Sequence, residues 1–429
     1  MSEYKVQGKI GQIERRAAEK AFFKFLFMRA RQKSDLFISY LTKTYISYST
    51  RDKVEKDKII FMHYNDVYQC NPKYIIEEIL RQGLDYDIVF VTSKAHMNEF
   101  PLPFPEGVRV VRRNSLEHFY EAATARVWVD NAVCFPWNYV PKKKNQIYIN
   151  TWHGSMGLKR IDASNIENKH WRDAAEIAGR ITNFMISDSE FETMVYRTTH
   201  WPDERVKVLE YGHPRNDILF CDDKKRAELK AKVCEFFDIE EDCNLILYAP
   251  TFRDARNLDC YDLDYNRVIA AAEARFGGKW KIINRYHFKV AKKLAGVKAI
   301  KNNPNILSGN TYDDIQELMA VCDIGITDYS SWICDFVLTG RLGFIYANDL
   351  QAYDKERGFY YPLDSTPFPI AENNDQLEAN ILNFDADKYA ADKEEFLKAR
   401  GSKEDGRAAE RVVSLLKRYM KEKKHSKED

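Results

Sequence analysis

Short apolar runs alternate with amphipathic segments along most of this chain. From Lys58 onward, strands are predicted at residues 59–63, 87–92, 108–111, 126–129, 146–149, 184–187 and 206–211. A second series of strands is predicted at residues 245–249, 281–284, 324–327 and 342–346. Helical periodicity lies between several of them, at residues 71–82, 117–124, 174–179, 266–276 and 312–321. Strands that alternate with helices in this way predict an α/β fold with parallel sheets.

The two series of strands predict two Rossmann-like domains in tandem, because 429 residues exceed what one ordinary core accommodates. A charged segment at residues 222–241 marks the boundary between them. We therefore expect an N-terminal domain at 58–221 and a C-terminal domain at 222–400. A charged helix and tail are expected at residues 401–429.

Residues 1–57 differ from the rest because they are rich in Lys and Arg and have helical periodicity. Their apolar residues recur at three- and four-residue spacing and include Ile13, Ala17, Ala21, Phe25 and Met28. A basic amphipathic helix of this kind suits an anionic membrane surface. The same pattern also suits a helix that packs on the body of the protein.

Composition excludes several classes of protein. The net charge of +1 gives no signature of nucleic-acid binding, and the eight cysteines contain no CxxC pair that would indicate zinc. No apolar run approaches the roughly 18 residues of a membrane span. Residues 22–28 are too short for a signal peptide and include Lys24. We expect a reduced protein that needs no metal and no cofactor.

Candidate chemistry lies in the segments that follow the strands, because open α/β sheets bind ligands beyond the carboxyl ends of their strands. After residues 146–149 the chain reads Asn-Thr-Trp-His-Gly-Ser, with a lysine at position 159. Gly154 lets the backbone approach a ligand, and Ser155 and Lys159 suit an anion near a helix start. His153 suits a base beside a phosphate, and the alternative is an ordinary hydrogen-bonded loop histidine.

Other segments after strands carry similar groups. Arg215 and Asn216 lie in a turn-rich stretch that either binds ligand or forms a rigid turn between the domains. The second series of strands is followed by polar and charged residues, namely Thr251, Arg253, Arg285, His287, Asp328, Ser330 and Ser331. Each of these three clusters alone is typical of helix capping. Because all three are expected at the same end of one sheet, together they favour a phosphate-bearing ligand. Arg357 lies in an aromatic loop that either covers a nucleotide or forms a surface turn.

Taken in order, these segments resemble the CDP-glycerol glycerophosphotransferase family, which builds teichoic-acid and related capsular polyol-phosphate polymers. The resemblance spans residues 150–365 and rests on the segments around His153, Arg215, Thr251, Arg285, Ser330 and Gly358. It implies a GT-B-like fold whose C-terminal domain holds the nucleotide and whose N-terminal domain meets the acceptor. It also implies a peripheral, monotopic association with the cytoplasmic face of the cell membrane. The residues at 155–157 and 365–369 depart from the usual family pattern.

The resemblance implies transfer of a polyol phosphate, above all glycerol phosphate, from a CDP-activated donor to a hydroxyl of a lipid-linked or saccharide acceptor. CMP would leave. His153 would be the base, and His287, Arg253 and the Ser330–Ser331 segment would stabilise the phosphoryl charge. Asp328 would order the loop, and Arg357 would close over the nucleotide. The alternatives are a CDP-ribitol donor, a GT-B glycosyltransferase that uses sugar nucleotides, and a silent membrane-bound scaffold.

Overall fold

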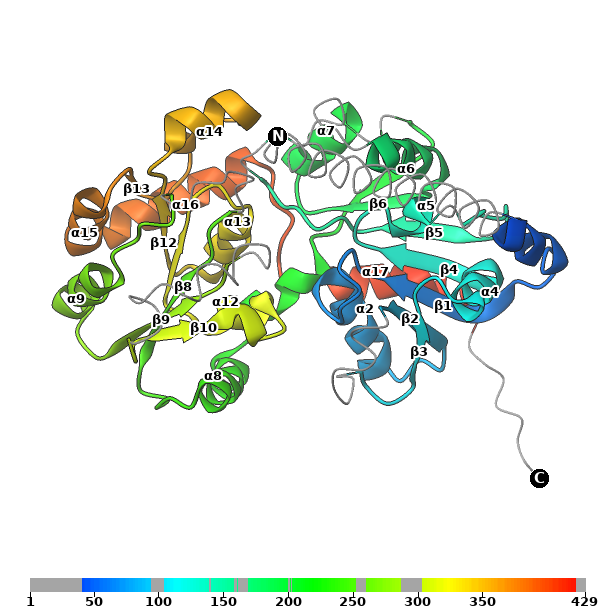
Figure 1. Cartoon of the computed structure of the whole chain (residues 1–429), viewed down its shortest axis with the longest axis horizontal. Coiled ribbons are helices and arrows are strands. Elements are labelled where there is room, and N and C mark those ends of the chain that lie inside the picture. Colours follow the sequence, from blue (N-terminus) through cyan, green and yellow to red (C-terminus); the bar gives the residue numbers. More distant parts are fainter. Residues whose placement is uncertain are drawn as a thin grey trace, which may run out of the picture.

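The computed structural model describes residues 41–93, 104–138, 140–157, 160, 169–199, 201, 203–251, 260–286 and 303–421. Its elements form two α/β lobes side by side, each with helices around a parallel sheet (Figure 1). This confirms the predicted α/β class with two parallel sheets. Most of the basic N-terminal segment lies outside the described residues, although residues 41–49 are helical.

The first lobe contains a seven-stranded sheet in the order β3-β2-β1-β4-β5-β6-β7. Its strands are β1 (Glu55–Met62), β2 (Asp87–Thr92), β3 (Val108–Arg112), β4 (Ala125–Asp130), β5 (Ile147–Asn150), β6 (Phe184–Ser187) and β7 (Lys207–Glu210). Its helices are α2 (Cys70–Arg81), α4 (Leu116–Thr124), α5 (Cys134–Trp137), α6 (Lys169–Ile181), α7 (Glu190–Thr198) and the 3₁₀ helix η2 (Pro214–Phe220). The central strands have buried apolar runs, such as residues 59–62 and 127–129, because helices cover both faces of the sheet.

The second lobe contains a six-stranded sheet in the order β10-β9-β8-β11-β12-β13. Its strands are β8 (Asn244–Tyr248), β9 (Trp280–Asn284), β10 (Ile306–Ser308), β11 (Ile324–Thr327), β12 (Leu342–Tyr346) and β13 (Ile370–Ala371). Its helices are α8 (Asp223–Phe237), α9 (Tyr265–Phe276), α12 (Ile315–Val321), α13 (Trp332–Phe336), α14 (Leu350–Arg357), α15 (Asn374–Leu382) and α16 (Ala386–Ala399). Three 3₁₀ helices complete it, η3 (Gly309–Thr311), η4 (Val337–Thr339) and η5 (Leu363–Ser365).

The two edge strands of the second sheet, β10 and β13, were not predicted from the sequence. They contain three and two residues, too few to show an alternating pattern. Both pair parallel to their neighbours, β10 to β9 and β13 to β12. Their place in the sheet therefore comes from tertiary packing and not from a local signal.

The last helix, α17 (Ala408–Lys417), returns to the first lobe (Figure 1). Val412, Val413 and Leu416 are fully buried there, in one apolar cluster with Ile59 and Phe61 of β1. A charged helix and tail were expected at residues 401–429, and α17 lies within this range with its apolar face covered by the first sheet. Among the residues that the structure describes, none of the helices combines the length and apolar character needed to cross a bilayer.

Candidate active site

A cavity of about 490 Å³ lies between the two lobes, where the carboxyl ends of β1, β5, β8, β9 and β11 meet. This volume falls in the range of roughly 300–1,000 Å³ that small-molecule sites occupy. Residues from both lobes line it, among them His63, Tyr64, His153, Arg215, Thr251, Arg285, Tyr286, Asp314, Ser330, Ser331 and Asp335. We call it the interlobe cavity.

His153 enters the interlobe cavity on a tight loop after β5. The side chain of Asn150 accepts the backbone N–H of Trp152 at 2.8 Å, and Trp152 has a left-handed φ of 49°. The Nδ1 atom of His153 lies 2.6 Å from the backbone oxygen of Asn131. Because a carbonyl oxygen only accepts, Nδ1 carries the proton, and the neutral ring keeps its lone pair on Nε2. His153 therefore has the tautomer that a general base needs.

The sequence reasoning missed His63 and Tyr64, which follow β1 at the same end of the sheet. Nδ1 of His63 accepts the backbone N–H of Asn65 at 3.2 Å, so its neutral ring carries the proton on Nε2. The ring of Tyr64 lies between the two histidines, 4.5 Å from each. The two histidines thus have opposite tautomers. The available signal was the position of His63 at the carboxyl end of a predicted strand.

The loop after His153 ties the two lobes together. Ser155 donates to the carboxylate of Asp188 at 2.8 Å, and the backbone oxygen of Gly154 accepts from Arg215. Met156 is fully buried, and it packs in the apolar core of the second lobe although it follows a strand of the first. Its backbone oxygen accepts from the hydroxyl of Tyr361. The loop is thus bonded to the first lobe at Gly154 and Ser155 and to the second lobe at Met156.

Arg215 and Asn216 form a buried junction with the second lobe. Arg215 donates Nε to Asp335 at 3.0 Å, and burial alone would lower the pKa of its guanidinium. The charge of Asp335, together with its hydrogen bond and with smaller contributions from Cys70 and Glu192, outweighs that effect and raises the pKa. Asn216 donates to Asp335 and Glu404 and accepts from Gln316, so its side chain is used within the protein. Arg215 lines the interlobe cavity, and Asn216 does not belong to its lining.

On the second lobe, Asp328 orders the two loops that carry hydroxyl groups. Its carboxylate accepts the backbone N–H of Thr251 at 2.8 Å and that of Tyr329 at 2.5 Å. Thr251, Ser330 and Ser331 then line the interlobe cavity together. Helix α13 begins just after Ser331 and has only five residues, and the Ser331 side chain makes no capping bond to it. The helix dipole here is therefore small, and the hydroxyls and backbone N–H groups are the available donors.

Arg285 follows β9 and also lines the interlobe cavity. Its guanidinium donates to the backbone oxygens of Gly309 at 2.7 Å and Asp313 at 3.2 Å, and also to that of Tyr312. Burial lowers the pKa of Arg285. Arg285 therefore holds the loop after β10 by hydrogen bonds and also adds positive charge to the cavity wall.

Other predicted site residues lie where their contacts are not described. Lys159, Arg253 and His287 fall outside the described residues. Arg357 is the last residue of α14, and its side chain lies outside the part that the structure describes. The roles proposed for these four residues therefore rest on the sequence alone.

Behind Ser155 lies a buried cluster of Asp188, Glu192 and His213. Burial raises the pKa of Asp188 and of Glu192 to about 7, and it lowers the pKa of His213 to about 4. Nε2 of His213 lies 2.9 Å from Glu192, and Glu192 also accepts the backbone N–H of Asp188 at 2.8 Å. These groups have the types and spacing of metal ligands, but their hydrogen bonds to one another already account for the cluster.

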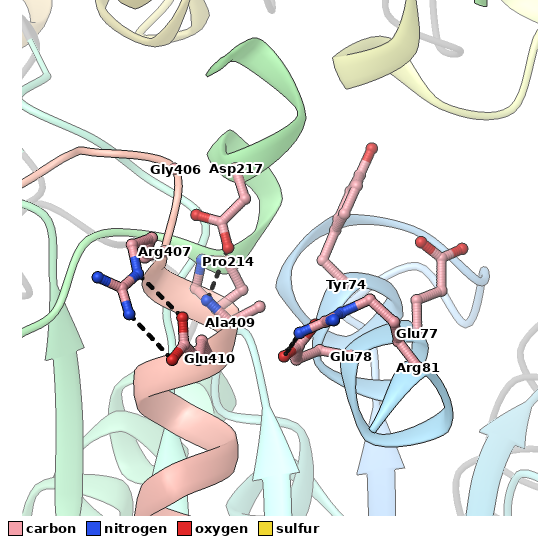
Figure 2. Close-up of a pocket in the computed structure, with 10 residues that line it drawn as sticks. All are labelled: Tyr74, Glu77, Glu78, Arg81, Pro214, Asp217, Gly406, Arg407, Ala409 and Glu410. Atoms are coloured by element: carbon pink, nitrogen blue, oxygen red, sulfur yellow. Dashed lines mark hydrogen bonds and ion pairs between the residues drawn. The ribbon is translucent and has the colours of Figure 1, made fainter. Parts of the chain in front are cut away.

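A separate hollow of about 380 Å³ lies between α2, η2 and α17 (Figure 2). Its two arginines are engaged by neighbouring glutamates, Arg81 by Glu78 at 2.6 Å and Arg407 by Glu410 at 2.9 Å. Asp217 accepts the first backbone N–H groups of α17. Because its charged groups pair locally, we assign no phosphate site to this hollow.

Comparison with known proteins points to one family. The family model for CDP-glycerol:poly(glycerophosphate) glycerophosphotransferase matches residues 44–418. The chain is 28% identical over 387 residues to the teichoic acid poly(glycerol phosphate) polymerase of Staphylococcus epidermidis, covering 86% of this chain and 52% of that protein. It is 27% identical over 387 residues to the teichoic acid glycerol-phosphate transferase of Staphylococcus aureus, covering 87% and 96% respectively.

Solved structures agree with this result. The structure of the wall teichoic acid polymerase TagF matches with a TM-score of 0.75 and 25% identity, covering 91% of this chain and 96% of the other. A histidine-to-asparagine variant of TagF soaked with CDPG matches with a TM-score of 0.74 and 25% identity, covering 90% of this chain and 97% of the other. The present chain spans about half the length of two of the curated relatives it matches. These matches confirm the resemblance seen in the sequence, and the chain belongs to the CDP-glycerol:poly(glycerophosphate) glycerophosphotransferase family.

Proposed function

We propose that this protein transfers glycerol phosphate from CDP-glycerol to a hydroxyl group of a teichoic-acid acceptor and releases CMP. The observation that carries this proposal is the tautomer of His153, which leaves Nε2 free of a proton. His153 lines the interlobe cavity together with two arginines, Arg215 and Arg285. Family membership supports the donor class. The CDPG soak of TagF supports the same donor.

In the proposed reaction the acceptor oxygen attacks the β-phosphorus of the donor. A new O–P bond forms, the bond between the β-phosphorus and the oxygen of CMP breaks, and the acceptor proton passes to Nε2 of His153. General-base help of this kind is worth on the order of 10²–10⁴ in rate. Arg215, Arg285 and the hydroxyls of Ser330 and Ser331 would balance the charge on the phosphoryl oxygens, since phosphoryl transfer depends mostly on placement and electrostatics.

The parts of the chain would divide the work as in a GT-B-like enzyme. The second lobe, with His287, Arg253, Thr251 and Arg357, would hold the CDP moiety, and Asp328 would keep those loops in place. The first lobe, with His153, Gly154, Ser155 and Lys159, would meet the acceptor. Asn216 would serve the junction between lobes rather than the substrate, because all its described bonds are to protein groups. Neither a metal nor a cofactor enters this scheme.

We also propose that the basic segment before residue 58 brings the enzyme to the cytoplasmic face of the membrane. Its Lys and Arg residues suit anionic headgroups, and its apolar face suits the interface. Co-sedimentation with vesicles that contain phosphatidylglycerol tests this, with phosphatidylcholine vesicles as the control. Equal binding to both kinds of vesicle, or to neither, contradicts it.

The central experiment is CMP release with a donor panel and an oligo(glycerol phosphate) primer. We expect CDP-glycerol to support the fastest transfer and UDP- or GDP-sugars to support none. The chain also matches the teichoic acid ribitol-phosphate primase of Bacillus spizizenii, at 27% identity over 308 residues, so CDP-ribitol belongs in the panel. Faster transfer from CDP-ribitol would replace the donor assignment. Failure of every CDP-polyol to bind would favour a scaffold role.

A further inference from the structure

A second, smaller cavity of about 140 Å³ is lined in part by the His153 loop. Its lining residues are Trp152, His153, Gly154, Ser155, Gly157, Phe191, Glu192, Val195, Tyr196, Ser331 and Tyr360. His153 and Ser331 line this cavity and the interlobe cavity alike. The two spaces therefore meet at the residue that we propose as the base. We call the smaller one the α7 cavity, because that helix provides four of its lining residues.

The walls of the α7 cavity are mostly rings and aliphatic groups. Trp152 packs edge-on against Trp201 with centroids 5.3 Å apart, which fixes the floor. Phe191 of α7 meets Tyr360 of the second lobe edge-on, with centroids 5.9 Å apart, so both lobes contribute to the wall of this cavity. The volume is below the roughly 300–1,000 Å³ of sites for larger ligands. The α7 cavity therefore has room for one small unit and not for a nucleotide.

The two cavities differ in the cations of their walls. The interlobe cavity has Arg215 and Arg285 in its wall, together with Asp314 and Asp335. Among the described residues that line the α7 cavity there is no Lys or Arg, and Glu192 contributes a buried carboxyl group. A phosphate placed in the α7 cavity would lose its hydration without gaining a cation, which is costly. Aromatic faces together with a few polar groups suit an uncharged polyhydroxyl unit instead.

We propose that the α7 cavity is the acceptor subsite and that it takes the uncharged terminal polyol unit of the acceptor. The C–H faces of that unit lie against Trp152 and Tyr360, and its reacting hydroxyl points to Nε2 of His153. The charged remainder of the acceptor stays outside. This inference rests on the proposed function. In-line phosphoryl transfer requires the nucleophile to enter opposite the leaving group. The proposal is compatible with this, because the nucleophile and the leaving group then occupy two different spaces.

The test fills the cavity without touching the groups assigned to chemistry. Val195 is 4% exposed and lines the α7 cavity, and Val195→Phe adds volume there. Met194, its neighbour on α7, is 47% exposed, so Met194→Phe is the matched control. We expect Val195→Phe to raise the KM for an oligo(glycerol phosphate) primer at least about tenfold. The Kd for CDP-glycerol and the thermal midpoint should match those of Met194→Phe.

The outcomes separate the subsite from the function. If the wild-type enzyme neither binds CDP-glycerol nor releases CMP, the proposed function fails. If it does both, and Val195→Phe has the primer KM of Met194→Phe, the subsite assignment fails. A rise in the Kd for CDP-glycerol instead of the primer KM would also overturn it, because the α7 cavity would then be part of the donor site.

A second variant keeps the proposal testable if Val195→Phe does not fold. Phe191→Leu removes the ring that meets Tyr360 in the wall of the α7 cavity while keeping an apolar side chain. We expect the same selective rise in the primer KM, with unchanged binding of CDP-glycerol. An unchanged primer KM in this variant contradicts the proposal even if Val195→Phe does not fold.

Discussion

The imidazole of His153 lies against the ring of Tyr64, with centroids 4.5 Å apart and planes 22° apart. Tyr64 also contacts His63, again with centroids 4.5 Å apart. Three rings from the segments after β1 and β5 therefore lie together in the wall of the interlobe cavity. Since Nδ1 of His153 is also bound to the Asn131 carbonyl, both the position and the tautomer of this base are determined by its surroundings.

The stack predicts that Tyr64 acts through its ring and not through its hydroxyl. Tyr64→Ala removes the surface that places His153, and a misplacement of about 1 Å can cost on the order of 10² in rate. We expect kcat to fall by that order while the Kd for CDP-glycerol changes little. Tyr64→Phe keeps the ring and should retain kcat. Equal loss in both variants would show that the hydroxyl matters.

Replacing the base itself should have the largest effect. We expect His153→Ala to lower kcat by on the order of 10²–10⁴, measured as CMP release with a primer. His170→Ala is the control, because that histidine contacts Trp137 outside the interlobe cavity. If His153→Ala turns over like His170→Ala, the role assigned to His153 is wrong.

The junction between Arg215 and Asp335 predicts a large loss of stability on breaking the pair. Asp335→Asn would leave the guanidinium of Arg215 buried without its counter-charge, which costs about 3–5 kcal/mol. Glu410→Gln breaks the exposed pair with Arg407 and should change the free energy of unfolding very little, because water screens both charges. Denaturant unfolding measures both. Similar costs for the two variants would contradict the assignment of Arg215 to a buried junction.

Met156 predicts a link between the His153 loop and the core of the second lobe. Met156→Ala deletes a fully buried side chain and should cost about 2–5 kcal/mol, together with a fall in kcat as the loop loosens. Met156→Leu keeps the volume and should cost less than about 1.5 kcal/mol. Unfolding curves and CMP release on the same samples check both effects. Full kcat in a destabilised Met156→Ala would show that the loop keeps its position without the anchor.

Glu192 predicts a pH dependence of stability. Its pKa is raised by burial from 4.5 to about 7, so over that range the folded chain keeps a proton that the unfolded chain releases. The stabilisation is present below the unfolded pKa and is lost as the pH rises through the folded one. Glu192→Gln removes this titration. We expect the thermal midpoint of this variant to rise relative to that of wild type as the pH increases from about 4.5 to about 7.

Scanning calorimetry at several pH values measures this difference. Glu190→Gln, at an exposed position on the same helix, is the control and should show no such trend. Asp188 and His213 remain in both proteins, and Asp188 contributes to the difference because, besides burial, the charge of Glu192 raises its pKa. A difference between Glu192→Gln and wild type that is constant or falls with pH would contradict the assigned cause.

The sequence by itself determined the fold class, the central strands and the segments that carry chemistry. Runs such as residues 59–62 and 324–326 contain no polar side chain because parallel strands are covered on both faces, and this leaves a local signal. The polar segments after those strands, including His153 and Ser330, follow from the rule that ligands bind at carboxyl ends. By the same rule His63 could have been predicted as a site residue, but the sequence pattern assigned it to the end of a strand.

Only the tertiary structure decided which of these groups work together. The burial of Met156 in the other lobe, the return of α17 to the first sheet and the pairing of Arg215 with Asp335 all join residues far apart in the chain. Such contacts depend on how the two lobes pack and leave no periodic pattern in the sequence. The tautomer of His153 was also decided there, because it depends on a carbonyl group 22 residues away along the chain.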